Sequence, residues 1–354
     1  MINKDVIIVG GGISGLSAAK ILSQYNLSVT IIDRNDYLGG QLKKQTHKLK
    51  SFDNQRGFEI IHTLIKLLKE HRNIEIILNT TSSAIYEDLI LTAINKNNYL
   101  KYKAKTYLIA TGSIDKHIAF ENNDLPGIFP SSVIQTLMHV YGIVPEKELL
   151  IFGSGNVALI IASYLIEAGL KVKAIVEESD HVLGDDMYLN KIHDLGIQLY
   201  LNYKIDKAIG ETAVEAVKIK HVKNKSEVII ENIQTLCVAS GLSPLTQLLN
   251  MSGVKMSYKT YLGGFVPVLN EFNQTSNPNI FACGDVTGIE DANISMYEGY
   301  LAGLGILKHL GYQNDEIDEQ LNLYQEKLHN LKEIMHIHYD TNNQKTLKVG
   351  PYVL

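Results

Sequence analysis

The first forty residues of the chain combine apolar runs with a glycine-rich segment. Residues 6–9 are apolar, residues 10–15 are rich in glycine, and residues 16–22 are small or apolar with a helical pattern. A second apolar run, 28–32, ends at Asp33. This order predicts a strand, a glycine turn, a helix and a second strand.

The glycines of this turn suit a bound diphosphate. Gly10 permits the tight turn, Gly12 lets the backbone approach the diphosphate, and Gly15 lets the helix pack closely on the strand. The ligand would sit on unpaired N–H groups at the helix N-terminus, where Ile13 and Ser14 lie. An accidental glycine turn is the alternative, which the flanking strand, helix and acid disfavour.

The acid at the end of the second strand extends this prediction to a nucleotide. A carboxylate there can accept hydrogen bonds from an adenosine ribose, so we assign Asp33, with Arg34 beside it, to the cofactor site. The turn alone does not choose between FAD and NAD. Gly40 and Gln41, after Gly39, favour FAD because a glycine pair lets the backbone run close beside a long cofactor.

The same pattern returns in the middle of the chain. An apolar run, 148–152, precedes a turn that contains Gly153, Gly155, Asn156 and Val157, and a helical stretch, 159–168, follows. The next strand, 172–176, ends at Glu177, with almost the spacing of the first unit. This internal repeat predicts an α/β fold with two dinucleotide-binding domains.

Glu177 indicates which second nucleotide is bound. A carboxylate at this position pairs with a ribose 2′-hydroxyl and repels a 2′-phosphate, and no arginine stands beside it. We therefore expect NAD(H) rather than NADP(H).

Between and after these units the pattern predicts further elements. We expect a helix over 58–71, a small antiparallel meander over 74–104, a helix over 131–141, a helix from 291 toward 307 and a helix over 315–336. A strand that stops on Ala110, Thr111 and Gly112 is predicted to pass the first cofactor again. Residues 236–241 have a similar pattern, an apolar run that ends in glycine.

A late strand ends in Gly284 and Asp285, and Asp285 could hydrogen-bond the ribityl chain of a flavin. The helix that follows begins near Asn293 and Ile294. If its N-terminus points at the flavin, its partial positive charge favours an anionic reduced flavin. A helix that serves only packing is the alternative.

The basic stretch 42–50 has no apolar helical face. A solvated loop is one interpretation of it. The other follows from its position directly after Gly40-Gln41: it would lie over the cofactor, where Lys44, Gln45 and His47 could hold an anionic substrate or steady charge on a reduced flavin. These three residues are our catalytic candidates.

Composition excludes several classes. A chain of 354 residues can form two domains, and 45% hydrophobic with 20% charged residues describes an ordinary globular protein. A formal net charge of -5 argues against general nucleic-acid binding. Without a membrane-length apolar run or a secretory signal before the first strand, we expect a cytoplasmic protein.

Cysteine and histidine positions argue against a metal centre and a dithiol. The two cysteines, Cys237 and Cys283, are far apart, so no C-x-x-C motif exists. His336 and His338 have no third ligand nearby in sequence and are expected on the surface. We therefore expect no metal site.

Taken together, the two glycine turns, Gly39-Gly40-Gln41, Ala110-Thr111-Gly112 and Cys283-Gly284-Asp285 resemble the two-dinucleotide-binding flavoproteins of the glutathione reductase and thioredoxin reductase superfamily. The resemblance implies two Rossmann-like, three-layer ββα domains. It implies an FAD domain over 1–120 with 251–311, an NAD domain inserted over 121–250, and a C-terminal tail over 312–354.

Within this superfamily the missing dithiol separates the chain from thioredoxin reductase. The segment 40–48, the pair Arg56-Gly57 and the stretch from Gly284 to Gly299 are more similar to the flavoprotein subunits of sarcosine oxidase, opine oxidase, hydrogen cyanide synthase and dye-linked proline dehydrogenase. Larger members carry an iron–sulfur domain that this chain lacks. The resemblance therefore implies a partner dehydrogenase or iron–sulfur subunit, or a homo-oligomer.

Three functions remain open from the sequence. The first is hydride exchange between NAD(H) and FAD, with electrons passed to a partner or a small acceptor. The second is direct oxidation of an amino acid or amine at the flavin, with the 43–50 segment holding a substrate carboxylate. The third is a non-catalytic FAD-binding scaffold in which the polar tail docks a partner.

Overall fold

The computed structural model describes residues 1–96 and 98–342, with side chains as far as residue 333. The chain forms two compact units, which are described separately. The first unit contains Met1–Ile114 and the described residues from Ser243 onward, and the second contains Asp115–Leu242. These transitions lie within eight residues of the predicted borders at 120 and 250. That one unit binds FAD and the other NAD stays a prediction.

A single mixed sheet forms the centre of the first unit. Its strand order is β5-β2-β1-β8-β7-β6, and β21 pairs with β8. The strands are β1 (Ile2–Val9), β2 (Val29–Ile32), β5 (Ile74–Ile77), β6 (Thr80–Ile85), β7 (Ile90–Asn95), β8 (Asn98–Ile109) and β21 (Ile280–Ala282). Because β1, β2, β8 and β21 run parallel, their carboxyl ends meet at one edge of the sheet, which we call the carboxyl edge of the first sheet.

Both faces of this sheet are buried, which explains the unbroken apolar run of β1. Val6 and Ile8 belong to the core beneath the helices, whereas Ile7 and Val9 belong to a second core that includes Leu248 of α6 (Gln247–Met251). Parallel strands covered on both faces characteristically lose the alternation of apolar and polar residues.

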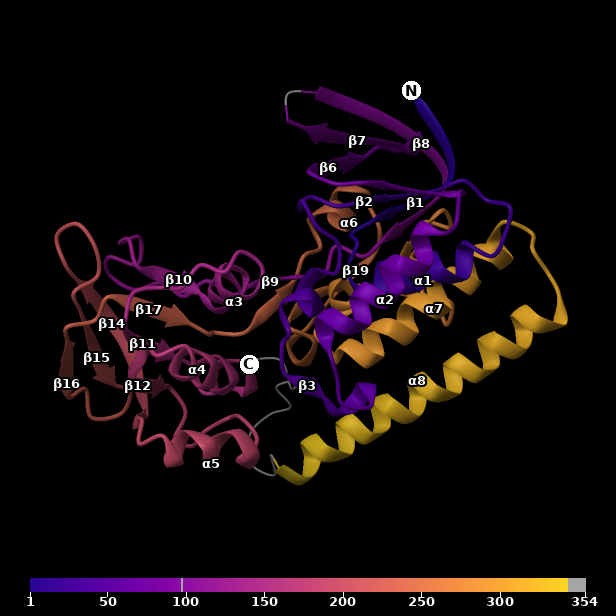
Figure 1. The fold of residues 1–354 in the computed structure, drawn as a ribbon. Helices are drawn as coiled ribbons and strands as arrows, with labels where there is room; N and C mark the ends of the chain where they lie inside the picture. Colours follow the sequence, from indigo (N-terminus) through magenta and orange to yellow (C-terminus); the bar gives the residue numbers. More distant parts are fainter. Residues whose placement is uncertain (97, 343–354) are drawn as a thin grey trace. The chain divides into compact units, whose positions relative to one another are not determined.

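Figure 1 shows α1 (Ile13–Leu22), α2 (Gly57–Lys69) and α7 (Ala292–His309) grouped beside this sheet. Glycines let α1 and α7 approach closely. A Cβ atom added at Gly299 would lie 2.2 Å from the carbonyl oxygen of Ser14, and one at Gly303 would lie 3.0 Å from Cβ of Ile21. The helix predicted over 58–71 is observed as α2.

The last helix, α8 (Asp315–Asn342), belongs to the first unit and packs on α7. Ile317 is 1% exposed and Leu321 is 3% exposed, and both lie in the helix-covered core. The helix predicted over 315–336, within the C-terminal tail of 312–354, is thus observed as α8, and one of its faces is seated in this core. The other end of that range, 343–354, lies outside the described residues.

The predicted meander over 74–104 is only partly right. β6, β7 and β8 pair antiparallel, but β5 pairs parallel with β2, at the far side of the sheet. Alternation along a short strand indicates which face is buried and carries no information about the partner strand.

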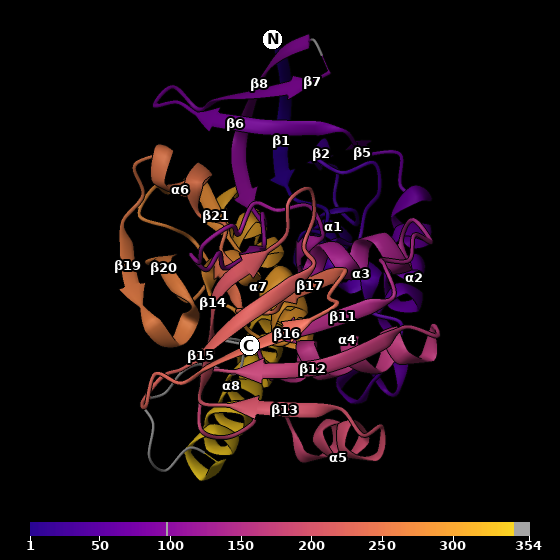
Figure 2. The ribbon, with the colours of Figure 1, turned by 90° about the vertical axis from the view of Figure 1, so that its left-hand side faces the viewer.

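The second unit repeats the strand, turn and helix order around a parallel sheet, seen in Figure 2. Its order is β10-β17-β11-β12-β13, formed by β10 (Ile128–Pro130), β11 (Glu148–Phe152), β12 (Lys171–Glu177), β13 (Gln198–Leu201) and β17 (Thr235–Val238). Its helices are α3 (Ser131–His139), α4 (Asn156–Glu167) and α5 (Asp186–Asp194). An antiparallel sheet of β14 (Tyr203–Ile209), β15 (Ala216–His221) and β16 (Glu227–Glu231) completes it.

Short elements connect these parts. Two of them, β9 (Ser113–Asp115) and β18 (Leu242–Pro244), pair where the chain passes between the units. The others are β3 (Lys48–Leu49), β4 (Gln55–Arg56), β19 (Met256–Lys259), β20 (Gly264–Pro267) and the 3-10 turns η1 (Gly40–Lys44), η2 (Lys50–Phe52), η3 (Thr260–Leu262) and η4 (Asp285–Thr287).

Candidate functional site

The first glycine turn is wedged between two strand ends. Gly10 has a φ of 108°, its N–H donates to the carbonyl oxygen of Ile32 at 2.9 Å, and an added Cβ would lie 2.1 Å from the carbonyl oxygen of Ala110. Any side chain here would collide with backbone, so the structure explains the first glycine of the motif. Gly15 is equally constrained, since its Cβ would lie 2.1 Å from the carbonyl oxygen of Gly10.

Gly12, in contrast, faces open space. A Cβ atom added there would meet nothing within 4 Å. Gly12 is the N-cap of α1, and no side chain caps this helix. The first N–H groups of a helix have no partner within it, so those of the first turn, where Ile13 and Ser14 lie, are available to a ligand. An uncapped helix start with an open cradle in front of it fits a diphosphate.

Asp33 lies at the end of β2 and holds this turn. It is 6% exposed, and its Oδ2 accepts a hydrogen bond from Gly11 N–H at 2.7 Å. Its Oδ1 accepts from the N–H of Asn35 at 2.8 Å, and burial raises its pKa. Each carboxylate oxygen has more than one acceptor site, so these bonds leave capacity for a ribose hydroxyl. That ribose contact stays a prediction, as does any role for Arg34, which is exposed.

The glycine pair after β2 touches the turn. Gly39 N–H donates to the carbonyl oxygen of Gly11 at 2.7 Å. A Cβ atom on Gly40 would lie 3.1 Å from Cα of Gly12. Gly40 and Gln41 therefore begin η1 directly beside the candidate diphosphate cradle, as the sequence pattern led us to expect.

The ends of β8 and β21 lie at the same carboxyl edge of the first sheet. Gly284 lies close to α1, since an added Cβ would be 2.3 Å from Oγ of Ser14. Oδ2 of Asp285 accepts a hydrogen bond from the Ser113 hydroxyl at 2.8 Å, and burial raises the pKa of Asp285 to about 6. Ala110, Thr111 and Gly112 follow β8, where Thr111 donates to the carbonyl oxygen of Leu245 at 2.8 Å.

The start of α7 differs from the expected bare helix terminus. Asp291 is its N-cap, and its carboxylate accepts from Asn293 N–H at 2.8 Å. This negative charge offsets part of the helix dipole that was expected to favour an anionic flavin. The side chain of Ile294 is 1% exposed.

The basic segment is folded rather than a solvated loop. Its first part forms η1, and Lys44 is only 9% exposed. Oε1 of Gln45 is buried without a hydrogen-bond partner among the described residues. A buried amide oxygen without a partner is costly, so it marks a place where a ligand or ordered water would be favourable. His47 is partly buried in the same segment.

The second unit builds the same turn from different residues. Gly153 has a φ of 100°, its N–H donates to the carbonyl oxygen of Val176 at 2.8 Å, and its Cβ would lie 2.2 Å from the carbonyl oxygen of Ala239. Glu177 is 5% exposed and accepts from the N–H of Ser154 at 2.9 Å and from its hydroxyl at 2.6 Å. The backbone contacts correspond to those around Gly10 and Asp33, whereas the bond from the Ser154 hydroxyl has no counterpart at Gly11.

A loop that the sequence reasoning missed completes this second turn. Gly184 N–H donates to the carbonyl oxygen of Ser154 at 2.9 Å, as Gly39 does to Gly11. In the sequence, a Leu-Gly dipeptide follows Asp33 and another follows Glu177. This shared dipeptide could have predicted the loop. The Asn156 side chain is engaged by this loop, because it exchanges hydrogen bonds of 3.0 and 2.7 Å with Asp185.

The other cofactor candidates of this turn lie at the start of α4. Gly155 is the N-cap, no side chain caps the helix, and Val157 is partly buried. The turn therefore offers the same uncapped helix start as the first one.

The two cysteines of the chain are not joined in a disulfide. Cys237 is in the second unit and Cys283 in the first, both are buried and unpaired, and burial raises the pKa of both thiols. Among the residues whose side chains are described, no group of three or more potential ligands could hold a metal ion. The side chains of His336 and His338 lie outside those residues.

No helix within the described part of the chain is both long and apolar enough to cross a membrane.

Comparison with known proteins agrees with this geometry. The chain is 23% identical over 341 residues to one of the subunits of opine oxidase from Rhizobium meliloti, covering 88% of this chain and 73% of that protein. It is 29% identical over 314 residues to NADH oxidase of Methanocaldococcus jannaschii, covering 80% of this chain and 63% of that protein.

A solved structure, L-proline dehydrogenase from P. horikoshii, matches with a TM-score of 0.72 at 25% identity, over 93% of this chain and 59% of that one. The chain thus spans only part of the length of these proteins. The two-domain Rossmann fold that the sequence predicts is confirmed by this likeness.

The sequence profile of the pyridine nucleotide-disulphide oxidoreductases matches residues 4–299, which include both glycine turns. The chain therefore belongs to the pyridine nucleotide-disulphide oxidoreductase family, whose members use FAD and NAD(P)H, in agreement with the predicted FAD and nicotinamide nucleotide.

Proposed function

We propose that this protein exchanges a hydride between NAD(H) and FAD and passes the electrons to a partner protein or a small acceptor. The observation that carries the proposal is the duplicated turn: Gly10 with Asp33 and Gly153 with Glu177 make the same backbone contacts. Two such turns provide for two dinucleotides in one chain. The bound flavin would supply the redox chemistry, and the protein supplies binding and orientation.

The first unit is the FAD site in this proposal. The α1 N-terminus holds the diphosphate, Asp33 the adenosine ribose, and Asp285 the ribityl chain. The glycine pair that includes Gly40 supports this, because it brings η1 against the turn and leaves room for an extended cofactor.

The second unit is the NAD site. The carboxylate of Glu177 is 5% exposed and sits at the end of β12. A 2′-phosphate placed beside it would bring two negative charges together in a poorly hydrated place. This supports NADH over NADPH.

The electron acceptor is proposed to be outside this chain. The sequence contains no C-x-x-C motif, which supports an acceptor other than a close-spaced dithiol of this chain. One similar protein is itself named as one component of opine oxidase, which supports a partner protein.

A second candidate function is direct oxidation of an amino acid or amine at the flavin. The unpartnered, buried Oε1 of Gln45 favours it, since an ammonium group could donate to this oxygen. Lys44 and His47 would complete that substrate site. Similarity to opine oxidase and L-proline dehydrogenase agrees with this class of substrate.

Anaerobic titration of the purified protein separates the two functions. Flavin absorbance is followed during addition of NADH, NADPH, proline, sarcosine or an opine. Stoichiometric bleaching by NADH, with much weaker bleaching by NADPH, is the expected result. Bleaching by an amino acid but not by NADH would replace the first function by the second. A purified protein that neither contains nor takes up FAD would contradict both.

A further inference from the structure

A cluster of three charged residues, in which the two carboxylates are largely buried and the lysine side chain is 34% exposed, joins the last helix to the loop after β21. We call Glu290, Glu298 and Lys332 the carboxylate–lysine cluster. Nζ of Lys332 lies 2.8 Å from Oε1 of Glu298 and 3.1 Å from Oε2 of Glu290. The two carboxylate side chains are 5% and 15% exposed. Lys332 comes from α8, and Glu298 from α7.

The other oxygen of Glu298 holds the loop that contains Asp285. Oε2 accepts the Gly284 N–H at 2.9 Å and the Thr287 hydroxyl at 2.9 Å. Gly284 has a φ of 78°, a conformation that strongly favours glycine. One carboxylate thus bonds both ends of the segment that carries Asp285.

The charge balance makes this arrangement depend on Lys332. Two largely buried carboxylates share one ammonium group, and burial together with the charge of Glu298 raises the pKa of Glu290. Without Lys332, the two carboxylates would be left without their cation, which is strongly unfavourable when groups are buried. Glu298 would then lose the ion pair that orients its carboxylate, and a turn of that carboxylate toward water would disturb its bonds to Gly284 and Thr287.

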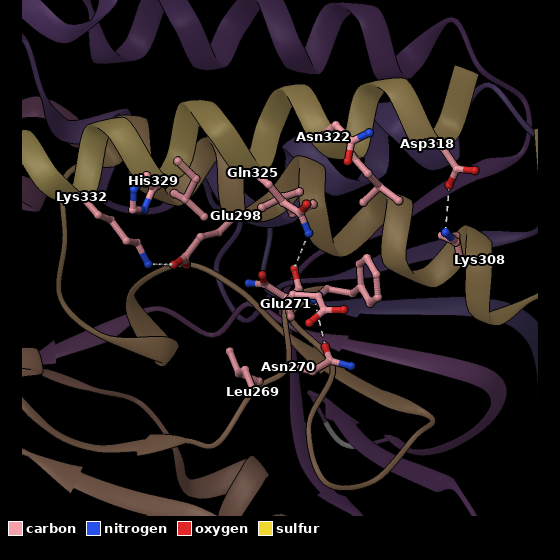
Figure 3. A pocket seen from close by; sticks show the side chains of 15 residues that line it. Leu269, Asn270, Glu271, Glu298, Lys308, Asp318, Asn322, Gln325, His329 and Lys332 are labelled. Carbon is pink, nitrogen blue, oxygen red and sulfur yellow. Dashed lines mark hydrogen bonds and ion pairs between the residues drawn. The ribbon is translucent and has the colours of Figure 1, made fainter. Parts of the chain in front are cut away.

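Figure 3 shows Glu298 and Lys332 of this cluster with their surroundings. An open groove of about 860 Å³ runs along α8, and Glu298 and Lys332 line one end of it. Lys308 and Asp318, also from α7 and α8, form a second ion pair of 2.8 Å at the other end. That second pair joins the same two helices without touching the loop.

We propose that Lys332 is a positioning residue for the flavin: by pairing with Glu298 and holding its carboxylate in place, it fixes the 284–287 loop and so Asp285, the residue proposed to bind the ribityl hydroxyls. This inference rests on the proposed FAD site in the first unit. It makes α8 a part of that site, although none of its described side chains is assigned to touch the cofactor.

The first test compares Lys332→Met with Lys308→Met as a matched control. Both substitutions remove an ammonium group that pairs α7 with α8. The Kd of FAD for the apoprotein is measured by quenching of flavin fluorescence, together with the Tm. We expect Lys332→Met to weaken FAD binding at least about tenfold, because two largely buried carboxylates lose their cation. Lys308→Met should weaken it less than about twofold, because its partner Asp318 is exposed. Equal weakening by both variants would overturn the inference, since it would reduce Lys332 to a helix-packing role.

A second test uses Glu298→Gln, which keeps an acceptor for Gly284 and Thr287 but removes the charge through which Lys332 is proposed to act on the loop; Glu290 still pairs with Lys332. In this background Lys332→Met should weaken FAD binding less than about threefold. The same loss as in the wild-type background would show that Lys332 acts by another route. Lys332→Arg should retain wild-type affinity.

Amide hydrogen exchange of the apoprotein gives a readout that is independent of FAD. The Gly284 amide should exchange at least about tenfold faster in Lys332→Met than in the wild type or Lys308→Met. Unchanged protection would contradict the inference even if the wild type binds FAD. If the wild type fails to bind FAD, the proposed function fails, and the exchange rates alone decide whether Lys332 holds the loop.

Discussion

At the scale of single residues, the two acids at the strand ends are the ones to which the proposed function assigns recognition of the nucleotide riboses. Asp33 and Glu177 each bind the backbone of their own glycine turn, so both fix the turn and present a carboxylate beside it. Their positions follow from sequence spacing. Their bonds to Gly11 and Ser154 did not, because those depend on how the turn folds back onto the strand end.

Replacing Glu177 should change which nucleotide reduces the flavin. Glu177→Gln removes the negative charge that disfavours a 2′-phosphate, so the preference for NADH over NADPH should fall at least about tenfold. One hydrogen bond to the backbone is lost as well, which costs about 1 kcal/mol of unfolding free energy. The measurement is the rate of flavin bleaching by each nucleotide. Glu178→Gln, at the exposed neighbouring position, is the control and should leave the ratio unchanged. An unaltered ratio in Glu177→Gln would refute the NADH assignment.

At the scale of elements, glycines decide how closely α1 and α7 pack. A Cβ atom added at Gly299 would overlap the carbonyl oxygen of Ser14. A Cβ atom added at Gly303 would make tight contacts of 3.0–3.3 Å with Ile21 and Ala18. The sequence pattern suggested close packing of this helix from its small residues. It did not show that the partner is α1, since helical periodicity identifies a face and not what covers it.

Alanine at these two glycines should have graded effects. Gly299→Ala places Cβ 2.2 Å from backbone and should cost about 2 kcal/mol or more of unfolding free energy, because α7 must move away from α1. Gly303→Ala meets its nearest atoms at 3.0–3.3 Å and should cost less than about 1 kcal/mol, partly offset by the better helix propensity of alanine. Chemical denaturation of the apoprotein measures both. The reverse order would contradict the packing described for α1 and α7.

At the scale of the whole molecule, two similar units are assigned different nucleotides. In each turn the first glycine is one at which a Cβ would strike the backbone of another strand end: Gly10 against Ala110 and Gly153 against Ala239. The predicted tail belongs to the first unit as α8, which weakens the scaffold interpretation in which that segment is free to dock a partner.

Substitution of these two glycines should separate FAD binding from reduction of the flavin by NADH. Gly10→Ala should abolish FAD binding, whereas Gly153→Ala should bind FAD at the wild-type level and lose bleaching by NADH, because only the second turn is distorted. FAD content and anaerobic NADH titration measure the two effects in each variant. Loss of FAD in Gly153→Ala, with normal FAD in Gly10→Ala, would reverse the assignment of the units.

The sequence by itself determined the local parts of this protein. The two strand–turn–helix units, the acids at Asp33 and Glu177 and the Gly284-Asp285 strand end are encoded within short stretches, because backbone conformation and strand or helix period depend on neighbouring residues. The tertiary structure alone decided the pairing of β5 with β2, the burial of Lys44, and the contact of Lys332 with Glu298. These contacts join residues far apart in the chain, and long-range partners are chosen by packing and charge balance in the folded molecule rather than by any local pattern.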